Sequence, residues 1–299
     1  MYDIVILTDH RYVNPEKADW YTQQVLDEDG LLKTALESKG LKVCKKDWAD
    51  KTFDWTSTKY AIFRTTWDYF ERFNEFFTWL ENTKNKTTFI NSSDIINWNI
   101  DKNYLQDLAI NKINIAPTLF VKKGDTITLN QLFEKTNWTE AVLKPAVSGA
   151  ARHTYRITPS NCSEIEAIFQ ELIKNEGMLF QEFLNNITTQ GEISLIMIGG
   201  KYTHAVKKIA KKGDFRVQDD HGGRVEKYTP TKEEVVFAEN CIQATPFKPM
   251  YARVDIVYDN NNNPSLSELE LIEPELWFRN HPKAAEQLAE EVIKILASK

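Results

Sequence analysis

The chain has 299 residues, of which 42% are hydrophobic and 27% are charged, and its net charge is −6. This length allows two or three domains, and the composition is ordinary for a globular protein with a substantial core. The net negative charge and the lack of a long basic run argue against nucleic acid or an anionic membrane as a partner. No apolar stretch reaches membrane-spanning length, and the first residues predict a strand rather than a signal peptide.

The first hundred residues predict alternating strands and helices. This alternation is typical of a parallel α/β sheet, in which ligands gather beyond the carboxyl ends of the strands. Residues 8–11 and 64–69 follow two such strand ends. Strands are expected at 4–7, 41–44, 60–64 and 88–90, and helices at 20–38 and 70–83.

The remainder of the chain predicts mixed elements, with a final amphipathic helix and a polar loop over 211–228. Gly199 and Gly200 predict the tight turn of a β-hairpin. Helices are expected at 101–110, 130–136, 161–175, 231–241 and 282–297, with Ser160 or Asn161 as a cap, and strands at 118–121, 141–144, 153–157, 178–184, 193–198 and 201–209.

The cysteines indicate the redox environment. The sequence contains three, Cys44, Cys162 and Cys241, and they stand far apart. An odd number of distant cysteines predicts neither a disulfide framework nor a zinc site. We therefore expect a reduced, cytoplasmic protein.

The last part of the chain predicts a β-hairpin that carries acidic side chains, with strands at 251–258 and 266–274. Because alternate side chains share a face of a strand, Glu268 and Glu270 point the same way, and Asp255 lies in the middle of the preceding strand. Carboxylates buried together repel one another and lose solvation unless a cation lies between them. Hard oxygen ligands that leave room for phosphates suit Mg²⁺, so the hairpin predicts a magnesium-dependent nucleotide site.

Two lysines that precede the hairpin are candidates for anion binding. Lys102 stands at a predicted helix start, and Lys144 ends an apolar strand, where a buried ammonium is costly unless it meets an anion. The next loop contains Ser148 and Gly149, and its small residues let backbone N–H groups approach a phosphate closely. The alternative is a surface lysine followed by an ordinary turn.

The end of the strand at 178–184 is a candidate adenine-binding segment. An exposed strand end offers a base one backbone N–H and one C=O, with an apolar side chain against the ring. Glu192, a few residues further on, could bind ribose hydroxyls. A plain strand end with two solvated acids is the alternative. The segment consists of Gln181, Glu182, Phe183 and Leu184.

Cations and backbone donors follow in the next hairpin and loop. Lys208 lies on a hairpin strand, and Arg216 lies in the loop, where its planar guanidinium matches a phosphate or a reacting carboxylate. His221 is a candidate general base, although a solvated loop histidine is the commoner case. Gly222 and Gly223 supply a mobile, donor-rich backbone.

Arg253 shares a strand face with Asp255 and has two possible roles. It either braces Glu268 or Glu270 as an ion-pair partner, or it contacts substrate. Trp67 is expected in the core rather than in a cofactor cage. No Walker A, G-x-S-x-G or H-E-x-x-H motif competes with the nucleotide-site interpretation.

Taken in this order, these residues resemble the ATP-grasp superfamily over residues 64–274. Within it, the chain resembles the glutathione-synthetase-like group that includes the D-cycloserine-forming cyclo-ligase. The resemblance implies an ATP-grasp fold of mixed α/β and α+β class: an N-terminal parallel α/β domain over 1–100, a small lid subdomain over 101–190 and a C-terminal antiparallel-sheet lobe over 191–299. The stretches that carry it are Arg64-Thr-Thr-Trp-Asp-Tyr69, Trp98-Asn-Ile-Asp-Lys-Asn-Tyr-Leu105, Leu143-Lys-Pro-Ala-Val-Ser148, Gly213-Asp-Phe-Arg-Val-Gln218 and Glu268-Leu-Glu-Leu-Ile-Glu-Pro274.

The resemblance also implies roles for individual residues. Lys102 and Lys144 would bind the phosphates of ATP, and Glu192 would lie at the ribose. Glu182 and Leu184 would lie at the adenine edge. The ion held by Asp255, Glu268 and Glu270 would be Mg²⁺, with Mn²⁺ as an alternative.

One departure from the family concerns the metal ligands. The usual motif is Glu-x-Asn, whereas this chain has Glu270 at the third position. The extra negative charge would tighten metal binding or require a cationic neighbour, for which Arg253 and Lys208 are candidates. Glu270 and Glu273 could form the pair instead, but Glu268 and Glu270 share one strand face.

The activity implied is an ADP-forming ligase that joins a carboxylate to an amine, or to another nucleophile, through an acylphosphate. Arg216 and backbone N–H groups at Gly222 and Gly223 would stabilise the tetrahedral oxyanion. Arg64 suits a second carboxylate, which favours an amino acid or small peptide as substrate. Asp9 and Asp68 are further candidates on the acceptor side.

Two other functions stay open at this point. The first is an ATP-grasp enzyme that modifies a peptide or protein, and the second is a non-catalytic nucleotide-binding protein. Members of the group are commonly dimers, so a homodimer is possible.

Overall fold

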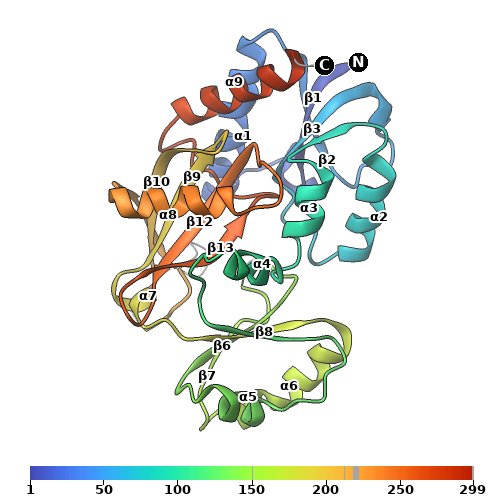
Figure 1. The fold of residues 1–299 in the computed structure, drawn as a ribbon. Coiled ribbons are helices and arrows are strands. Elements are labelled where there is room, and N and C mark those ends of the chain that lie inside the picture. The colour runs from blue at the N-terminus through green and yellow to red at the C-terminus, as the bar shows by residue number, and fades with distance from the viewer. Residues whose placement is uncertain (150, 212, 218–221, 298–299) are drawn as a thin grey trace.

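The computed structural model describes residues 1–149, 151–211, 213–217 and 222–297, and these form three β-sheets surrounded by helices (Figure 1). Ala150, Gln218 and His221 lie outside the described residues. The role of His221 as a general base therefore stays a prediction. No helix of the described part of the chain is both long enough and apolar enough to cross a membrane.

The N-terminal sheet is parallel, with strand order β2-β1-β3-β4, as the alternating pattern predicts. Ile4 and Ile6 on β1 pack in a cluster with helices α1 and α9, whereas Val5 and Leu7 pack in an aromatic cluster with α2. Both faces of the sheet are covered, which is why its central strands are almost wholly apolar. The elements are β1 (Tyr2–Thr8), α1 (Trp20–Ser38), β2 (Val43–Asp47), β3 (Thr58–Thr65), α2 (Phe73–Thr83) and β4 (Thr88–Ile90), with short 3₁₀ helices η1 (His10–Tyr12) and η2 (Trp55–Ser57).

Two short helices, rather than one predicted helix, connect this sheet to the next. Helix α3 (Ser93–Asn99) has Ser92 as its N-cap, and α4 is Tyr104–Ile110. The predicted helix over 101–110 is therefore wrong at its start, and Lys102 lies in the turn between the two helices.

The second sheet is antiparallel, with strand order β5-β8-β6-β7, and helices α5 and α6 pack against it. Asn161 occupies the N-cap position of α6, but its side chain accepts from the backbone N–H of Thr158 instead of capping the helix. Strand β8 ends at Glu182, so Phe183 and Leu184 follow the strand. The elements are β5 (Thr118–Val121), α5 (Leu129–Thr136), β6 (Ala141–Pro145), β7 (Tyr155–Ile157), α6 (Cys162–Asn175) and β8 (Met178–Glu182).

The third sheet is also antiparallel and has the order β11-β10-β9-β12-β13. Gly199 and Gly200 form the predicted turn, with φ of +57° and +78°. The predicted loop over 211–228 is wrong at its end, because Arg224–Tyr228 pairs with β10 as an edge strand that is too polar to show an apolar alternation. The elements are α7 (Asn186–Thr189), β9 (Glu192–Ile198), β10 (Lys201–Ile209), β11 (Arg224–Tyr228), α8 (Lys232–Gln243), β12 (Tyr251–Tyr258), β13 (Pro264–Glu270) and α9 (Lys283–Ala297).

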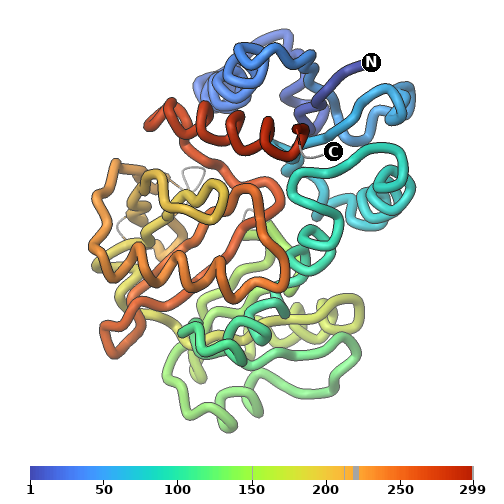
Figure 2. The backbone as a smooth tube through the Cα atoms, turned by 45° about the horizontal axis from the view of Figure 1, so that its top comes forward, coloured from blue at the N-terminus to red at the C-terminus, as the bar shows by residue number. Residues whose placement is uncertain are grey.

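The first and third sheets share a packed interface. Figure 2 shows α9 beside α1, and the two helices bury a common apolar cluster with β1, β3 and β9. Asn91, just after β4, donates from Nδ2 to the carbonyls of Tyr251 and Leu271 at 2.9 and 2.8 Å. This contact fixes the carboxylate hairpin against the N-terminal sheet.

Candidate functional site

A cavity of about 480 Å³ lies between the second and third sheets and extends to the loops of the first. It brings together residues that are far apart in the sequence. The residues proposed from the sequence that line it are Lys102, Lys144, Ser148, Gly149, Gln181, Glu182, Phe183, Leu184, Glu192, Lys208, Arg216, Arg253, Asp255, Glu268, Glu270 and Glu273.

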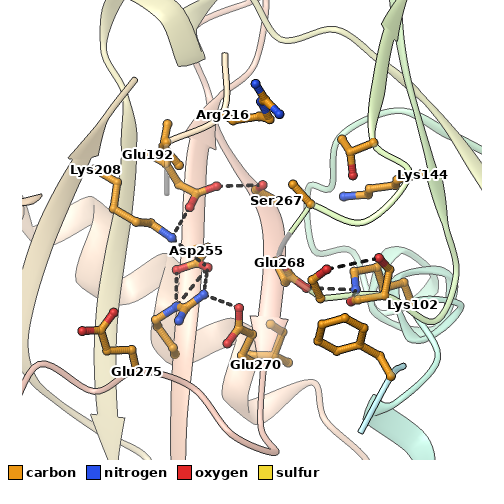
Figure 3. A pocket seen from close by; sticks show the side chains of 18 of the residues that line it. Lys102, Lys144, Glu192, Lys208, Arg216, Asp255, Ser267, Glu268, Glu270 and Glu275 are labelled. Atoms are coloured by element: carbon orange, nitrogen blue, oxygen red, sulfur yellow. Dashed lines mark hydrogen bonds and ion pairs between the residues drawn. The ribbon is translucent and has the colours of Figure 1, made fainter. Parts of the chain in front are cut away.

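The acidic residues of the hairpin meet at the centre of this cavity (Figure 3). Strands β12 and β13 pair Asp255 with Glu268 and Arg253 with Glu270, which puts all of them on one face. Asp255, Glu268 and Glu270 each offer a carboxylate oxygen, and these atoms lie within 4.8 Å of one another. Three converging carboxylates fit a hard divalent cation such as Mg²⁺.

Two buried cations, Lys208 and Arg253, form ion pairs with carboxylates of the site. Lys208 forms an ion pair with Glu192, and its Nζ lies 3.3 Å from Oδ2 of Asp255. Nη2 of Arg253 lies 2.8 Å from Oδ2 of Asp255 and also pairs with Glu270. Of the two roles left open for Arg253, the ion pair with Glu270 is thus confirmed.

The ring of Trp277 supports both cations. Nζ of Lys208 lies 5.8 Å, and Cζ of Arg253 lies 5.3 Å, from the centroid of this ring. Trp277 comes from the loop after β13 and is 2% exposed. Cation–π contacts of this kind strengthen when water is excluded, so the tryptophan helps to fix the two charges in place.

The three carboxylates have different proton affinities. Burial raises the pKa of Asp255, but Arg253 and Lys208 outweigh burial and bring the value down to about 2. Burial likewise opposes ionisation of Glu268, yet Lys102 and Lys144 leave its pKa below the ordinary value. A bound divalent cation would favour the ionised form of all three.

Glu270 differs from these two. Burial and the nearby carboxylates raise its pKa to about 8, although Arg253 opposes the shift. Glu273 also lines the cavity, and burial raises its pKa to about 7 against the effect of Lys102. Without a cation beside them, both carboxyls therefore tend to hold a proton near neutral pH, and a bound divalent cation would favour their ionised form.

The two lysines lie opposite the candidate metal ligands. Nζ of Lys102 lies 3.1 Å from Oε1 of Glu268 and donates to the carbonyl of Ser148 at 2.6 Å. Burial lowers the pKa of Lys144, and Glu268 only partly offsets that effect. Gly149 is closely packed, since an added Cβ would lie 2.6 Å from Cε1 of Phe70. The ammonium groups and this loop together form a cradle suited to phosphates.

The end of β8 forms an apolar slot. The ring of Phe183 lies under the guanidinium of Arg156, 3.9 Å from its Cζ, and edge-to-face with Phe215 at 5.9 Å between centroids. Phe215, which also lines the cavity, was not among the predicted site residues. Its neighbour Arg216 lines the cavity with Nη2 2.8 Å from Oδ2 of Asp214.

Glu192 is buried near this slot. Its carboxylate pairs with Lys208 and accepts a hydrogen bond from Oγ of Ser267 at 3.1 Å. Burial raises the pKa of Glu192, while Lys208 acts in the opposite direction. Its expected role at a ribose stays a prediction.

Arg64 differs from its expected position. It is 1% exposed and lies outside the cavity lining. Its Nη2 is 3.7 Å from Oε1 of Glu28, and its guanidinium stacks over the rings of Tyr251 and Phe278. The end of a central strand points here into the interface between two sheets, so the arginine is a buried structural cation.

Asp9, Asp68, Gly222 and Gly223 also lie outside the cavity lining. Asp9 is fully buried and binds the guanidinium of the neighbouring Arg11. Asp68 accepts from Nε1 of Trp48 and from Arg72. We expected Asp9 and Asp68 to contact substrate. Both instead lie outside the cavity lining and accept hydrogen bonds from protein donors.

Several cavity residues were not predicted from the sequence. Trp67, expected in the core, lines the cavity instead. The stretches 8–11 and 64–69 were identified by their place after strand ends, but nothing local showed which of their side chains face the ligand. Arg11 lies within the first of these stretches and lines the cavity, whereas residues that the sequence did not indicate on this side include Tyr12, Tyr21, Glu275 and Trp277.

Comparison with known families identifies the class. Residues 4–91 match the N-terminal domain of D-cycloserine synthetase DcsG, and residues 105–260 match the ATP-grasp domain of prokaryotic glutathione synthetase. The second match covers more than half of the chain. The protein therefore belongs to the prokaryotic glutathione synthetase family of ATP-grasp enzymes and is an ATP-dependent ligase.

The chain is also similar to individual ATP-grasp enzymes. The cycloserine biosynthesis protein DcsG of Streptomyces lavendulae is 26% identical over 249 residues, which cover 79% of this chain and 82% of the relative. The crystal structure of D-cycloserine synthetase DcsG superposes with a TM-score of 0.86 at 23% identity, covering 98% of this chain and 99% of that one. D-alanine–D-alanine ligase from Bacillus anthracis has a TM-score of 0.65 at 15% identity, covering 98% and 97%. At these identities the two structures show a shared fold.

Proposed function

We propose that this protein is an ATP- and Mg²⁺-dependent carboxylate–amine ligase that acts on a small amino-acid-like substrate through an acylphosphate. The observation that carries the proposal is the arrangement of three carboxylates, Asp255, Glu268 and Glu270, opposite Lys102 and Lys144 in one cavity. The carboxylates supply oxygen ligands for a metal, and the lysines supply the positive charge that a triphosphate requires.

The proposed reaction has two steps. A substrate carboxylate oxygen forms a bond to the γ-phosphorus while the bond to ADP breaks. An amine then forms a bond to the acyl carbon, and phosphate leaves. When bound, Mg²⁺ would supply charge neutralisation at the phosphates. Lys102 and Lys144 are proposed to hold and orient these groups, and Arg216, which lines the cavity, is proposed to stabilise the oxyanion.

The adenine is proposed to occupy the slot at the end of β8, between Phe183, Leu184 and Phe215, with Gln181 and Glu182 at its edge. The acceptor is proposed to share this cavity with the nucleotide and to be small. The similarity to the cycloserine biosynthesis protein DcsG and to D-alanine–D-alanine ligase supports a small substrate.

The experiment that tests the proposal measures ADP release with Mg²⁺ and ATP across amino acids and dipeptides, singly and in pairs. Substrate-dependent ADP supports a ligase, and ADP with a single compound indicates cyclisation or a carboxylate that awaits its amine. Nucleotide binding without ADP release across the whole panel would overturn the small-substrate proposal. That result would favour a peptide or protein substrate, or a non-catalytic role.

A further inference from the structure

The tip of the carboxylate hairpin contacts the segment that is proposed to bind adenine. Strands β12 and β13, which carry the candidate metal ligands, are joined by an asparagine-rich turn over 259–263. Figure 1 shows this tip beside α7, and Nδ2 of Asn186 on that helix donates to the carbonyl of Asp259 at 2.8 Å. The third sheet therefore meets the end of β8 at this turn.

Asn260 makes the contacts that reach furthest towards the cavity. Its Nδ2 donates to the carbonyl of Phe183 at 3.1 Å and to Oε1 of Glu182 at 3.2 Å. Its Oδ1 accepts from the backbone N–H of Asn185 at 3.0 Å. These partners fix the orientation of the amide, because the N–H needs an acceptor and the carbonyl needs a donor. One side chain thus holds the backbone and a side chain of residues 182–185.

Phe183 is held from the second sheet as well. Its backbone N–H donates to the carbonyl of Glu140 at 3.1 Å, and the carboxylate of Glu140 pairs with Arg156, whose guanidinium lies over the Phe183 ring. Both backbone groups of Phe183 are therefore engaged by protein partners. The next residue, Leu184, lines the cavity, and within the described residues its backbone N–H donates to no protein acceptor. The conformation of Phe183 decides where this N–H points.

The turn that carries Asn260 is itself fixed. Oδ1 of Asp259 accepts from the backbone N–H groups of Asn261 and Asn263, both at 2.9 Å. Oδ2 of Asp259 accepts from Nδ2 of Asn114 at 3.0 Å, and Asn114 lies in the connection that enters the second sheet before β5. The turn therefore contacts the chain both where it enters and where it leaves that sheet.

We propose that Asn260 is a positioning residue for nucleotide binding, which holds residues 182–185 so that the N–H of Leu184 faces the base. Asn260 is exposed and does not line the cavity, so it acts through Phe183 and not by touching the nucleotide. Because the candidate metal ligands lie on the same hairpin, one element positions both the base end and the phosphate end of the nucleotide. The proposal rests on the ligase function proposed above and concerns the nucleotide subsite of that enzyme.

The test compares two variants of Asn260 by calorimetry with Mg²⁺ and AMPPNP. Asn260→Ala removes the amide, and we expect AMPPNP affinity to fall by about 3- to 10-fold, the usual size of a lost neutral hydrogen bond. Asn260→Asp keeps the shape and the acceptor for Asn185, but it places a negative oxygen against the carbonyl of Phe183 and the carboxylate of Glu182. We expect this variant to bind AMPPNP about 10- to 100-fold more weakly than wild type.

The matched control is Asn261→Ala in the same turn. Asn261 is exposed, and within the described part of the chain its side chain makes no hydrogen bond, because only its backbone N–H contacts Asp259. We expect AMPPNP affinity to be unchanged in this variant. The thermal unfolding midpoint of each variant, measured without ligand, shows whether the fold is retained.

A second ligand separates positioning of the base from general damage to the site. GMPPNP has the same ribose and triphosphate as AMPPNP but a different base edge. We expect Asn260→Ala to lower the affinity for AMPPNP more than that for GMPPNP, so that the preference for adenine over guanine narrows.

Two results would overturn the role of Asn260. One is wild-type AMPPNP affinity in Asn260→Asp, and the other is an equal loss of affinity for AMPPNP and GMPPNP in Asn260→Ala. A wild-type protein that binds no AMPPNP would instead contradict the proposed ligase function itself, so the two failures are distinguishable.

Discussion

The guanidinium of Arg253 donates to the carboxylate of Asp255, two residues further along β12, from Nε at 3.0 Å and from Nη2 at 2.8 Å. The same guanidinium pairs with Glu270 on the neighbouring strand. One protein cation thus holds two of the three candidate metal ligands in register. A metal ion bound between them would act on carboxylates that are already oriented, which lowers the cost of assembling the site.

The first prediction concerns the metal. Glu270→Ala removes one carboxylate from the cluster while Arg253 keeps its contact with Asp255. We expect ADP formation to fall by at least about 100-fold, since metal affinity and positioning are both impaired. The thermal unfolding midpoint should stay near that of wild type. The control is Glu226→Ala, which removes an exposed glutamate paired with Arg224. Retained turnover in Glu270→Ala would refute the metal assignment.

The second prediction concerns the nucleotide phosphates. Lys144→Met keeps most of the side-chain volume but removes the buried charge. We expect AMPPNP affinity, measured by calorimetry, to fall by about 10- to 100-fold, because a charge-assisted contact is lost. The folding stability of the variant should be equal to or higher than that of wild type. Burial strips water from the ammonium group of Lys144, which costs free energy and lowers its pKa. Lys174→Met, an exposed lysine on α6, is the control, and equal nucleotide affinity in the two variants would count against the role of Lys144.

The third prediction compares two glycines. Gly191 and Gly40 both have positive φ, +76° and +83°, so alanine is strained at either position. At Gly191 the new Cβ would also lie 2.4 Å from the carbonyl oxygen of Lys208, whereas at Gly40 it meets nothing within 4 Å. We expect Gly191→Ala to lower the free energy of unfolding by about 1–3 kcal/mol more than Gly40→Ala, measured by denaturant titration. An equal decrease in the free energy of unfolding in the two variants would mean that the backbone at Lys208 can shift at little cost.

The fourth prediction concerns pH. Burial of His204, together with the stacked ring of His281, lowers the pKa of His204 from 6.5 to about 4, although Nε2 donates to the carbonyl of Leu276. Between pH 4 and pH 6.5 the unfolded chain therefore binds a proton at His204 that the folded protein does not bind. The stability that neutral His204 confers is therefore present above pH 6.5 and is lost as the pH falls towards 4.

The measurement is chemical denaturation of wild type and His204→Gln at pH 7.5 and 4.5. Between pH 7.5 and pH 4.5, we expect the free energy of unfolding of the wild type to fall by about 2 kcal/mol more than that of the variant. This figure follows from about 1.4 kcal/mol for each unit of pKa shift. Parallel pH profiles would contradict a buried, neutral His204.

The sequence predicted the parts of the site that depend on local spacing. Glu268 and Glu270 share a face because side chains alternate along a strand, and the structure pairs them with Asp255 and Arg253 as the hairpin requires. Lys144 was identified because a charge at the end of an apolar strand needs a partner. The edge strand β11 escaped prediction, because it is polar on both faces and owes its form to pairing with β10.

The acceptor side could not be chosen from the sequence. Arg64 and Arg11 both follow the carboxyl end of a central strand, and local pattern gives each the same prospect of facing a ligand. The sequence by itself determined the alternating N-terminal domain, the carboxylate hairpin and the lysines of the proposed nucleotide site. Only the tertiary structure decided that Arg64 is buried against Glu28 while Arg11 lines the cavity. The burial of a strand end depends on which sheet packs over it. Here the hydroxyl of Tyr251 in the third sheet donates to the carbonyl of Phe63, 188 positions away in the sequence.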